Sequence, residues 1–262
     1  MDKFASAITA RPQGINEAEW KARLELAACY RLFAYLGWTE LIFNHITVRA
    51  PDDGSGERRY LINPFGLHYS EVTASNLIKV GLDGEPVHDT AYSVNRAGFV
   101  IHSAIHSKVH DAHCIMHVHT TAGMAVACKE AGLGTDNFYS AQIAGDVAYH
   151  DYEGVTTRTD EQDHLVKSLA DKHCLILRNH GLLVWEDNLP NAFFLMFTLN
   201  RACEIQLAAA SIPGPNRAVT PQAITDSLHR KHRSVDPKGG LQQKVFDAMV
   251  LKAGISSYDM LV

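Results

Sequence analysis

The sequence His113-Cys-Ile-Met-His-Val-His-Thr120 lies near the middle of the chain and alternates between two kinds of side chain. Its second, fourth and sixth residues are apolar, which is the period-two pattern of a strand with one apolar face. His117 and His119 therefore point to the same side of that strand. Their Cα atoms are expected to lie about 6.5 Å apart, so both imidazoles can converge on one ion about 2 Å from each nitrogen.

A third histidine can join this pair from a turn. His180 lies in Arg178-Asn179-His180-Gly181, at the end of an apolar run, where glycine permits a sharp turn that projects a side chain over a sheet edge. Three neutral imidazoles leave at least one coordination position open, which is typical of catalytic rather than structural metal sites. The alternative for His117 and His119 is a strand face exposed to solvent, and spacing alone does not decide between the two.

Two further histidines lie on a predicted helix that leads into the same strand. His102 and His106 are spaced i, i+4 within residues 98–108 and share a face that differs from the apolar stripe. Each is a candidate for a fourth ligand, a partner that orients a ligand, or a general base. The alternative is a solvated helix face, which is favoured for His106. Arg178 and Asn179 either orient an anionic substrate or satisfy nearby backbone groups.

The rest of the chain mixes hairpins with helices. Apolar residues at helical spacing and capping signals predict helices over residues 16–36, 98–108, 120–131, 159–169, 190–210 and 241–252, with a helical turn at 73–77. Alternation predicts strands over residues 42–50, 59–62, 78–82, 113–120 and 146–152, and over 175–185 with a break at Asn179-His180-Gly181. Because many of these strands follow one another without a helix between them, we expect an α/β sandwich on a mostly antiparallel sheet.

Length and composition place the chain among ordinary globular proteins. The 262 residues are 46% hydrophobic and show no break in composition, so one substantial core is expected. Residues 1–15 are expected to form a loose arm, and residues 16–262 a single domain with a helical extension after about residue 211. The cysteines are odd in number and mostly set in apolar runs, which indicates reduced thiols: Cys29, Cys114, Cys128, Cys174 and Cys203.

Charge and hydropathy argue against two kinds of partner. The formal net charge is -5 and the lysines and arginines are scattered, whereas nucleic-acid surfaces and polybasic membrane anchors need clustered positive charge. No stretch approaches the roughly 20 apolar residues of a spanning helix, and the N-terminus shows no secretory signal. We therefore expect a cytoplasmic protein that binds neither nucleic acid nor membrane. Glycine-rich phosphate loops and a Gly-x-Ser-x-Gly elbow are also absent from the sequence.

Several ordered stretches match one known family. They are Gly37–Arg49 (GWTELIFNHITVR), Ile62–Leu67 (INPFGL), Ser70–Ser75 (SEVTAS), Asn95–His106 (NRAGFVIHSAIH), His117–His119 (HVH), Val147–Gly154 (VAYHDYEG), Leu175–Leu182 (LILRNHGL) and Ala202–Gln206 (ACEIQ). With these motifs the chain resembles the class II aldolase/adducin family, and within it the adducin-head-like branch, from about residue 17 to residue 211.

This resemblance implies a fold, an assembly and a metal. The fold is a three-layer α/β/α sandwich around a mostly antiparallel central sheet, commonly assembled as a homotetramer with sites near subunit interfaces. One divalent metal ion would be held by His117, His119 and His180. It would polarise a substrate carbonyl or hydroxyl and stabilise the enediolate left when a carbon–carbon bond breaks. Zinc is the first expectation, with manganese and iron as alternatives, because imidazole ligands suit all three.

The sequence also departs from the sugar-phosphate aldolases of that family. These enzymes carry a proton-transferring Glu four residues before a helix histidine, and counting back from His102 gives Gly98. Their phosphate-binding loop is replaced here by bulkier groups in Asn44-His45-Ile46-Thr47 and Phe65-Gly66, so a fuculose- or ribulose-phosphate substrate is not expected. The candidates for proton transfer are, in decreasing order, His102, His45 and a tyrosine such as Tyr139 from a neighbouring subunit.

Three functional hypotheses follow from the sequence and the resemblance. The first is a metal-dependent lyase that performs aldol cleavage or decarboxylation on a small oxygenated substrate, supported by the complete set of three histidines. The second is a non-catalytic interaction protein like an adducin head, with actin or spectrin as partners. The missing Glu supports it, whereas the absence of a Lys-rich tail argues against it. The third is an epimerase that uses the same site with other proton-transfer groups.

Overall fold

The structure, a computed structural model, describes residues 11–154, 160–228 and 240–256. Its centre is a seven-stranded sheet in the order β3-β2-β1-β4-β7-β6-β5. The strands are β1 (His45–Arg49), β2 (Arg59–Ile62), β3 (Ile78–Gly81), β4 (Cys114–Val118), β5 (Val147–His150), β6 (Cys174–Leu177) and β7 (Gly181–Glu186). Neighbouring strands are antiparallel except β5 and β6, which are parallel. The prediction of a mostly antiparallel sheet is confirmed.

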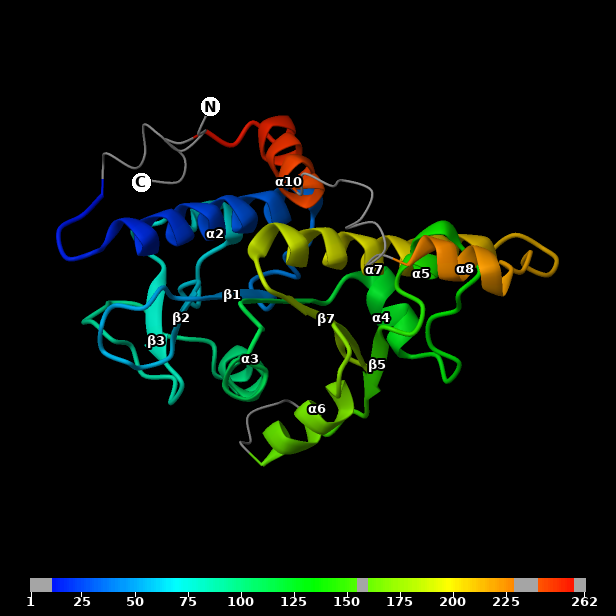
Figure 1. The fold of residues 1–262 in the computed structure, drawn as a ribbon, viewed down its shortest axis with the longest axis horizontal. Helices are drawn as coiled ribbons and strands as arrows, with labels where there is room; N and C mark the ends of the chain where they lie inside the picture. The colour runs from blue at the N-terminus through cyan, green and yellow to red at the C-terminus, as the bar shows by residue number, and fades with distance from the viewer. Residues whose placement is uncertain (1–10, 155–159, 229–239, 257–262) are drawn as a thin grey trace.

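Helices cover both faces of this sheet, as Figure 1 shows. The helices are α2 (Glu17–Leu36), α3 (Arg96–Lys108), α4 (Thr121–Ala127), α5 (Phe138–Gln142), α6 (Glu161–Leu169), α7 (Leu189–Ala210), α8 (Pro221–Ser227) and α10 (Leu241–Lys252), with a 3-10 turn η1 (Tyr69–Glu71). Helices α2 and α7 lie along one face, while α3 and α6 lie on the other (Figure 1). The three-layer α/β/α sandwich is therefore confirmed.

The alternation of the central strand decides which layer each side chain joins. Cys114, Met116 and Val118 of β4 belong to the core beneath α2 and α7. Ile115 belongs to the smaller core beneath α3 and α6. His117 shares the parity of Ile115 and so faces the α3 side, as the period-two pattern predicts.

Helix α2 begins and ends where the sequence predicts. The side chain of Asn16 accepts a hydrogen bond from the backbone N–H of Glu19, and Gly37 ends the helix in the left-handed conformation at φ 73°. Both devices satisfy backbone groups that a helix terminus leaves unpaired. The buried face of the helix carries Trp20 and Leu24, both fully covered.

Some predicted boundaries are wrong for identifiable reasons. The strand expected from residue 42 begins only at His45, because Glu40 and Leu41 both adopt positive φ in the preceding turn. The helix expected to reach residue 131 ends at Ala127, whose carbonyl accepts from the backbone N–H of Asn179 instead of continuing the helix. The helical turn expected at residues 73–77 is present as a single turn, closed by a hydrogen bond from the Leu77 N–H to the Thr73 carbonyl.

Three short elements escaped prediction, namely η1, α5 and α8, because each is too short to show a helical period. The start expected for α6 at residue 159 lies outside the described residues, and the structure shows the helix from Glu161. The expected domain limits stay a prediction. Among the described residues, no helix combines the length and apolar character needed to cross a membrane.

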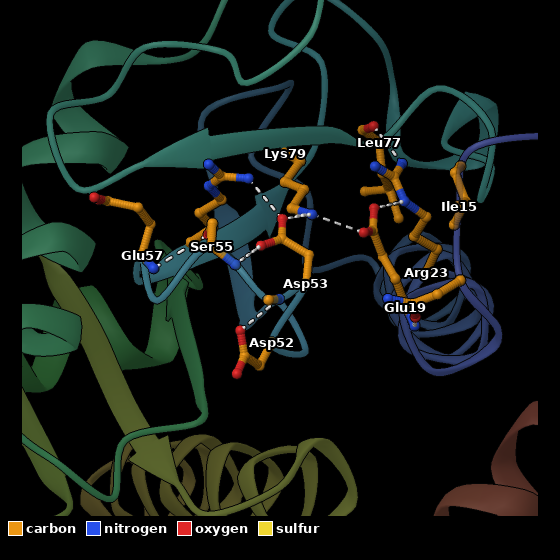
Figure 2. Close-up of polar contacts among 12 residues, drawn as sticks. Ile15, Glu19, Arg23, Asp52, Asp53, Ser55, Glu57, Leu77 and Lys79 are labelled. Carbon is orange, nitrogen blue, oxygen red and sulfur yellow. Dashed lines mark hydrogen bonds and ion pairs between the residues drawn. The ribbon is translucent and has the colours of Figure 1, made fainter.

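A buried ionic network ties α2 to the sheet, as Figure 2 shows. The Lys79 ammonium of β3 lies 2.8 Å from a carboxylate oxygen of Glu19 and 2.8 Å from one of Asp53. The second Glu19 oxygen accepts from the Arg23 guanidinium at 2.9 Å, and Arg23 also donates to the Leu77 carbonyl. Burial alone raises the pKa of Glu19, but the hydrogen bonds and charges of Lys79 and Arg23 outweigh it and leave that pKa lowered.

Replacing Glu19 with glutamine should destabilise the fold and reduce its sensitivity to acid. Because the folded-state pKa of Glu19 is lowered, its contribution is present above the ordinary value of 4.5 and is lost as the pH falls through the folded value. Glu19→Gln leaves the buried Arg23 without its carboxylate and removes one of the two carboxylates of Lys79, which should cost about 3–5 kcal/mol of unfolding free energy at neutral pH. In urea unfolding, the gap to wild type should shrink below about pH 4.

The matched control is Glu17→Gln, since Glu17 lies in the same helix turn but is exposed. Its effect should stay within about 0.5 kcal/mol. Equal stability of the two variants would show that the network does not stabilise the fold.

Candidate metal centre

His117 is held in place by the sheet itself. It lies on β4, is 1% exposed, and faces His45 across the antiparallel pair with β1. Its Nδ1 is 2.9 Å from the carbonyl oxygen of Leu182 on β7. A carbonyl can only accept, so Nδ1 carries the proton and Nε2 of the neutral ring keeps its lone pair. This is the protonation state in which an imidazole can act as a metal ligand through Nε2.

His119 follows the end of β4 and is positioned through its backbone. Its N–H donates to Oδ1 of Asn44 at 3.0 Å, and Asn44 Nδ2 donates to the Trp38 carbonyl at 2.9 Å. The Nε2 atoms of His117 and His119 then lie 2.7 Å apart. The sequence placed Asn44 in an altered phosphate loop but gave no sign of this positioning role, because its partner is 75 residues away.

His180 lies in the turn between β6 and β7, beside the end of β4. The residue with left-handed backbone is Asn179, at φ 57°, rather than Gly181. Glycine is needed at position 181 for close approach instead, because a Cβ there would lie 2.6 Å from the Val118 carbonyl oxygen and 2.9 Å from the His119 ring. The prediction that this turn projects His180 beside the other two histidines is consistent with the geometry.

The ligand nitrogens of His117, His119 and His180 all lie within 4.8 Å of one another. Tetrahedral zinc with bonds of about 2.0–2.1 Å places its ligand nitrogens about 3.3 Å apart. The Nε2 atoms of His117 and His119, 2.7 Å apart, are closer than this spacing, and the 4.8 Å limit for the whole set is wider than it. Rotations of the rings would bring the three nitrogens to the spacing that the ion needs. Burial lowers the pKa of all three, that of His119 to about 4; the neighbouring rings of the set add to this for His117 and His119, and His150 adds to it for His180. The donor set is therefore neutral at neutral pH and fits a divalent metal.

His102 and His106 are both buried against the sheet. The expectation that His106 lies on a solvated helix face is wrong, because α3 turns this face toward β1 and leaves His106 only 2% exposed. The Thr47 hydroxyl lies 2.7 Å from His102 Nδ1 and 2.8 Å from His106 Nε2. Burial lowers the pKa of His106 to about 3 and that of His102 well below its usual range, so both rings are neutral.

His45 connects this buried pair to the three ligand candidates. Its ring stacks on His102 with centroids 4.4 Å apart and meets His117 edge-on at 5.0 Å. Neither ring nitrogen makes a hydrogen bond of ordinary length and angle among the described residues, although the nearby Phe43 backbone favours the charged form of the ring. Burial lowers the pKa of His45 to about 3.

The His45 ring also explains the missing carboxylate. A Cβ built on Gly98 would lie 2.3 Å from His45 Cδ2 and 2.7 Å from its Nε2. Any side chain at position 98 therefore collides with the histidine ring. The imidazole occupies the space into which a Glu at this position would extend.

Two other candidates lie elsewhere. The Tyr139 ring on α5 packs against Phe138 and Phe197, so within one chain its aromatic contacts are not with the histidines. Its expected role across a subunit interface stays a prediction. The Arg178 guanidinium donates to the Lys129 carbonyl and stacks over Tyr149, which favours the backbone-satisfying role that the sequence left open.

Comparison with known proteins defines the class of protein. Residues 24–207 match the family described as Class II Aldolase and Adducin N-terminal domain. The chain belongs to this family.

Individual relatives come from both branches. A Pseudomonas aeruginosa protein, whose name assigns it only provisionally to the class 2 aldolases, is 45% identical over 197 residues, covering 75% of this chain and 74% of that protein. Alpha-adducin from Mus musculus is 45% identical over 208 residues, which are 78% of this chain but 28% of adducin.

Solved structures agree with the fold. The crystal structure of an aldolase II superfamily protein from Pseudomonas syringae has a TM-score of 0.84 at 36% identity and covers 93% of this chain and 96% of its own. L-fuculose 1-phosphate aldolase from Glaciozyma antarctica has a TM-score of 0.78 at 25% identity, with coverage of 98% and 99%.

Alanine at position 98 should destabilise the protein through His45. Helix propensity alone would make Gly98→Ala stabilising by about 1 kcal/mol. The collision with the His45 ring should reverse the sign and cost about 1–3 kcal/mol. In a double-mutant cycle with His45→Ala, unfolding experiments should give a coupling free energy of at least about 1 kcal/mol.

The control pairs Gly98→Ala with His164→Ala, an exposed histidine on α6. These two changes should add within about 0.5 kcal/mol. Additivity in both cycles would mean that Gly98 and His45 do not share this space.

Proposed function

We propose that this protein is a metal-dependent lyase that cleaves a carbon–carbon bond in a small oxygenated substrate. The observation that carries the proposal is the convergence of three neutral imidazoles from β4, from the residue that follows it and from the β6–β7 turn, with ligand nitrogens within 4.8 Å. Three protein ligands leave a coordination position open for substrate. A pure scaffold would have no reason to keep the complete set of three histidines together.

Within this proposal, His117, His119 and His180 hold one divalent ion, for which we expect zinc, with manganese and iron as alternatives. When bound, the ion acts as a Lewis acid toward a substrate carbonyl or hydroxyl. His102 and His45 are the first two candidates for moving the proton, since both are neutral and each has a ring nitrogen without a partner among the described residues. Tyr139 from a neighbouring subunit is the third.

The substrate class follows from what stands next to the ligands. Gly98 with the His45 ring replaces the carboxylate of the sugar-phosphate aldolases, and Asn44 binds backbone groups instead of forming a phosphate loop. A sugar phosphate of the fuculose or ribulose type is therefore not proposed, although one relative of similar fold is named for such an activity. A small hydroxy or keto acid suits the remaining chemistry, by aldol cleavage or decarboxylation.

Assembly and location are part of the same proposal. We expect a homotetramer in the cytoplasm, because the family resemblance implies a tetramer and the sequence carries no basic patch for nucleic acid or membrane. The neighbouring subunit would then complete the site.

A second candidate function is a non-catalytic interaction module. The observation that favours it is 45% identity to alpha-adducin, a level equal to that of the bacterial relative. Actin or spectrin would then be the partners. A co-sedimentation assay with filamentous actin and spectrin separates this function from the lyase. An epimerase would use the same metal and would invert a stereocentre without breaking the carbon skeleton, which product analysis distinguishes.

The lyase proposal is tested by turnover. Protein loaded separately with zinc, manganese or ferrous iron is incubated with a panel of 2-keto acids and hydroxy acids, and carbonyl products and carbon dioxide are measured. At least one combination of metal and substrate should show turnover, and His180→Ala should reduce that turnover by at least about 100-fold. Mutating a residue that only hydrogen-bonds a metal ligand already lowers activity by about 10–100-fold. His110→Ala is the control, since His110 is exposed. No turnover with any metal, or equal turnover in both variants, would sink the proposal.

A further inference from the structure

The hydroxyl of Thr47 lies between two histidine rings in the interior of the protein. Thr47 is on β1 and is fully buried, and both rings come from α3. Its Oγ1 is 2.7 Å from His102 Nδ1 and 2.8 Å from His106 Nε2. The chain of contacts continues to the backbone, since His106 Nδ1 is 3.1 Å from the carbonyl oxygen of Ala112.

The position of each proton in this series of hydrogen bonds follows from which groups can donate and which can only accept. The Ala112 carbonyl can only accept, so His106 carries its proton on Nδ1 and has a lone pair on Nε2. The Thr47 hydroxyl therefore donates its single proton to His106 Nε2. With that proton committed, Thr47 Oγ1 can only accept from His102, whose proton must lie on Nδ1. Nε2 of the neutral His102 ring is consequently unprotonated.

This unprotonated nitrogen is unusual for a buried site. His102 is fully covered, and its Nε2 has no hydrogen-bond partner among the described residues. The ring stacks on His45, which in turn meets the His117 ring edge-on. This buried lone pair is an acceptor that no described donor satisfies, which is uncommon for a purely structural histidine.

We propose that Thr47 and His106 are positioning residues that fix His102 in the Nδ1-protonated tautomer, so that its Nε2 starts the reaction as a proton acceptor. This inference rests on the lyase function proposed above. It also specifies which of the two lyase reactions, aldol cleavage or decarboxylation, is favoured. Neither Thr47 nor His106 needs to touch substrate for this role.

Aldol cleavage begins with a base, whereas decarboxylation does not. The hydroxyl proton of the substrate passes to His102 Nε2, and the O–H electron pair forms the new carbonyl. The carbon–carbon bond breaks, and its electron pair moves onto the adjoining carbonyl to give an enolate. The negative charge of the enolate offsets the cost of a buried imidazolium. His102 then returns the proton to the enolate carbon and regains its starting tautomer, so no further reactant is needed.

A carboxylate that leaves as carbon dioxide has no proton to give, and the enolate left behind needs an acid. A nitrogen poised as an acceptor therefore favours aldol cleavage over decarboxylation.

The test is a direct reading of the His102 tautomer. Zinc-loaded protein labelled with 15N in its histidine side chains is examined by solid-state NMR, which does not depend on the size of the assembly, and His102→Gln identifies the His102 signals. Wild type should show a protonated Nδ1 and an unprotonated Nε2. Thr47→Val keeps the shape of the side chain but removes the hydroxyl, and should give a substantial Nε2-protonated population. Thr47→Ser should restore the wild-type pattern.

His106→Leu offers a second route if Thr47→Val fails to fold. It frees the Thr47 proton, which can then be donated to His102 Nδ1, so the tautomer should again become mixed. Thr198→Val is the matched control, because it removes another buried threonine hydroxyl, one that donates to the Phe194 carbonyl. An Nε2-protonated His102 in wild type, or an unchanged tautomer in both Thr47→Val and His106→Leu, would overturn the inference. Loss of turnover in the metal screen would leave this reading intact and would count against the lyase instead.

Discussion

The pairing of β1 with β4 is the constraint on which the rest of the candidate site depends. Its register sets His45 opposite His117 and Thr47 opposite Ile115. All four side chains lie on the face of the sheet that α3 covers. Helix α3 places His102 and His106 against this face, where both contact the Thr47 hydroxyl. Because side chains alternate along a strand, a slip of one residue would turn each of them to the other face. The two apolar cores prevent that slip, because it would also move the apolar residues of β4 out of the cores that they fill.

This arrangement has a cost in stability that a purely structural role would avoid. Within the described part of the chain, both nitrogens of His45 and Nε2 of His102 are buried without a hydrogen-bond partner. Each such group costs about 1–3 kcal/mol relative to a satisfied one. The Glu19, Lys79 and Arg23 network and the large core beneath α2 and α7 lie apart from these rings and maintain the fold. The Tyr60 and Tyr69 hydroxyls are also buried without a hydrogen-bond partner among the described residues, so these rings are distinguished by their position. Three unpartnered ring nitrogens gather beside the three ligand candidates, where function would require them.

The sequence could predict much of this, and the limits are physical. Alternation in β4 and the caps of α2 are local signals, so the sandwich and its main helices were predictable. Family motifs pointed to the three histidines and to the absence of a carboxylate at Gly98. The role of Asn44 and the burial of His106 were not predictable, because both depend on partners far away in the chain. The collision between Gly98 and His45 became visible only once α3 was placed against β1.

The most direct test of the account is X-ray absorption spectroscopy at the metal edge on protein purified without chelator, with metal content measured on the same sample. The account predicts close to about one equivalent of a divalent ion per chain, bound by three imidazole nitrogens at about 2.0–2.1 Å if the ion is zinc. A content below about 0.1 equivalent, or an ion without imidazole ligands, would contradict the claim that His117, His119 and His180 form a metal site.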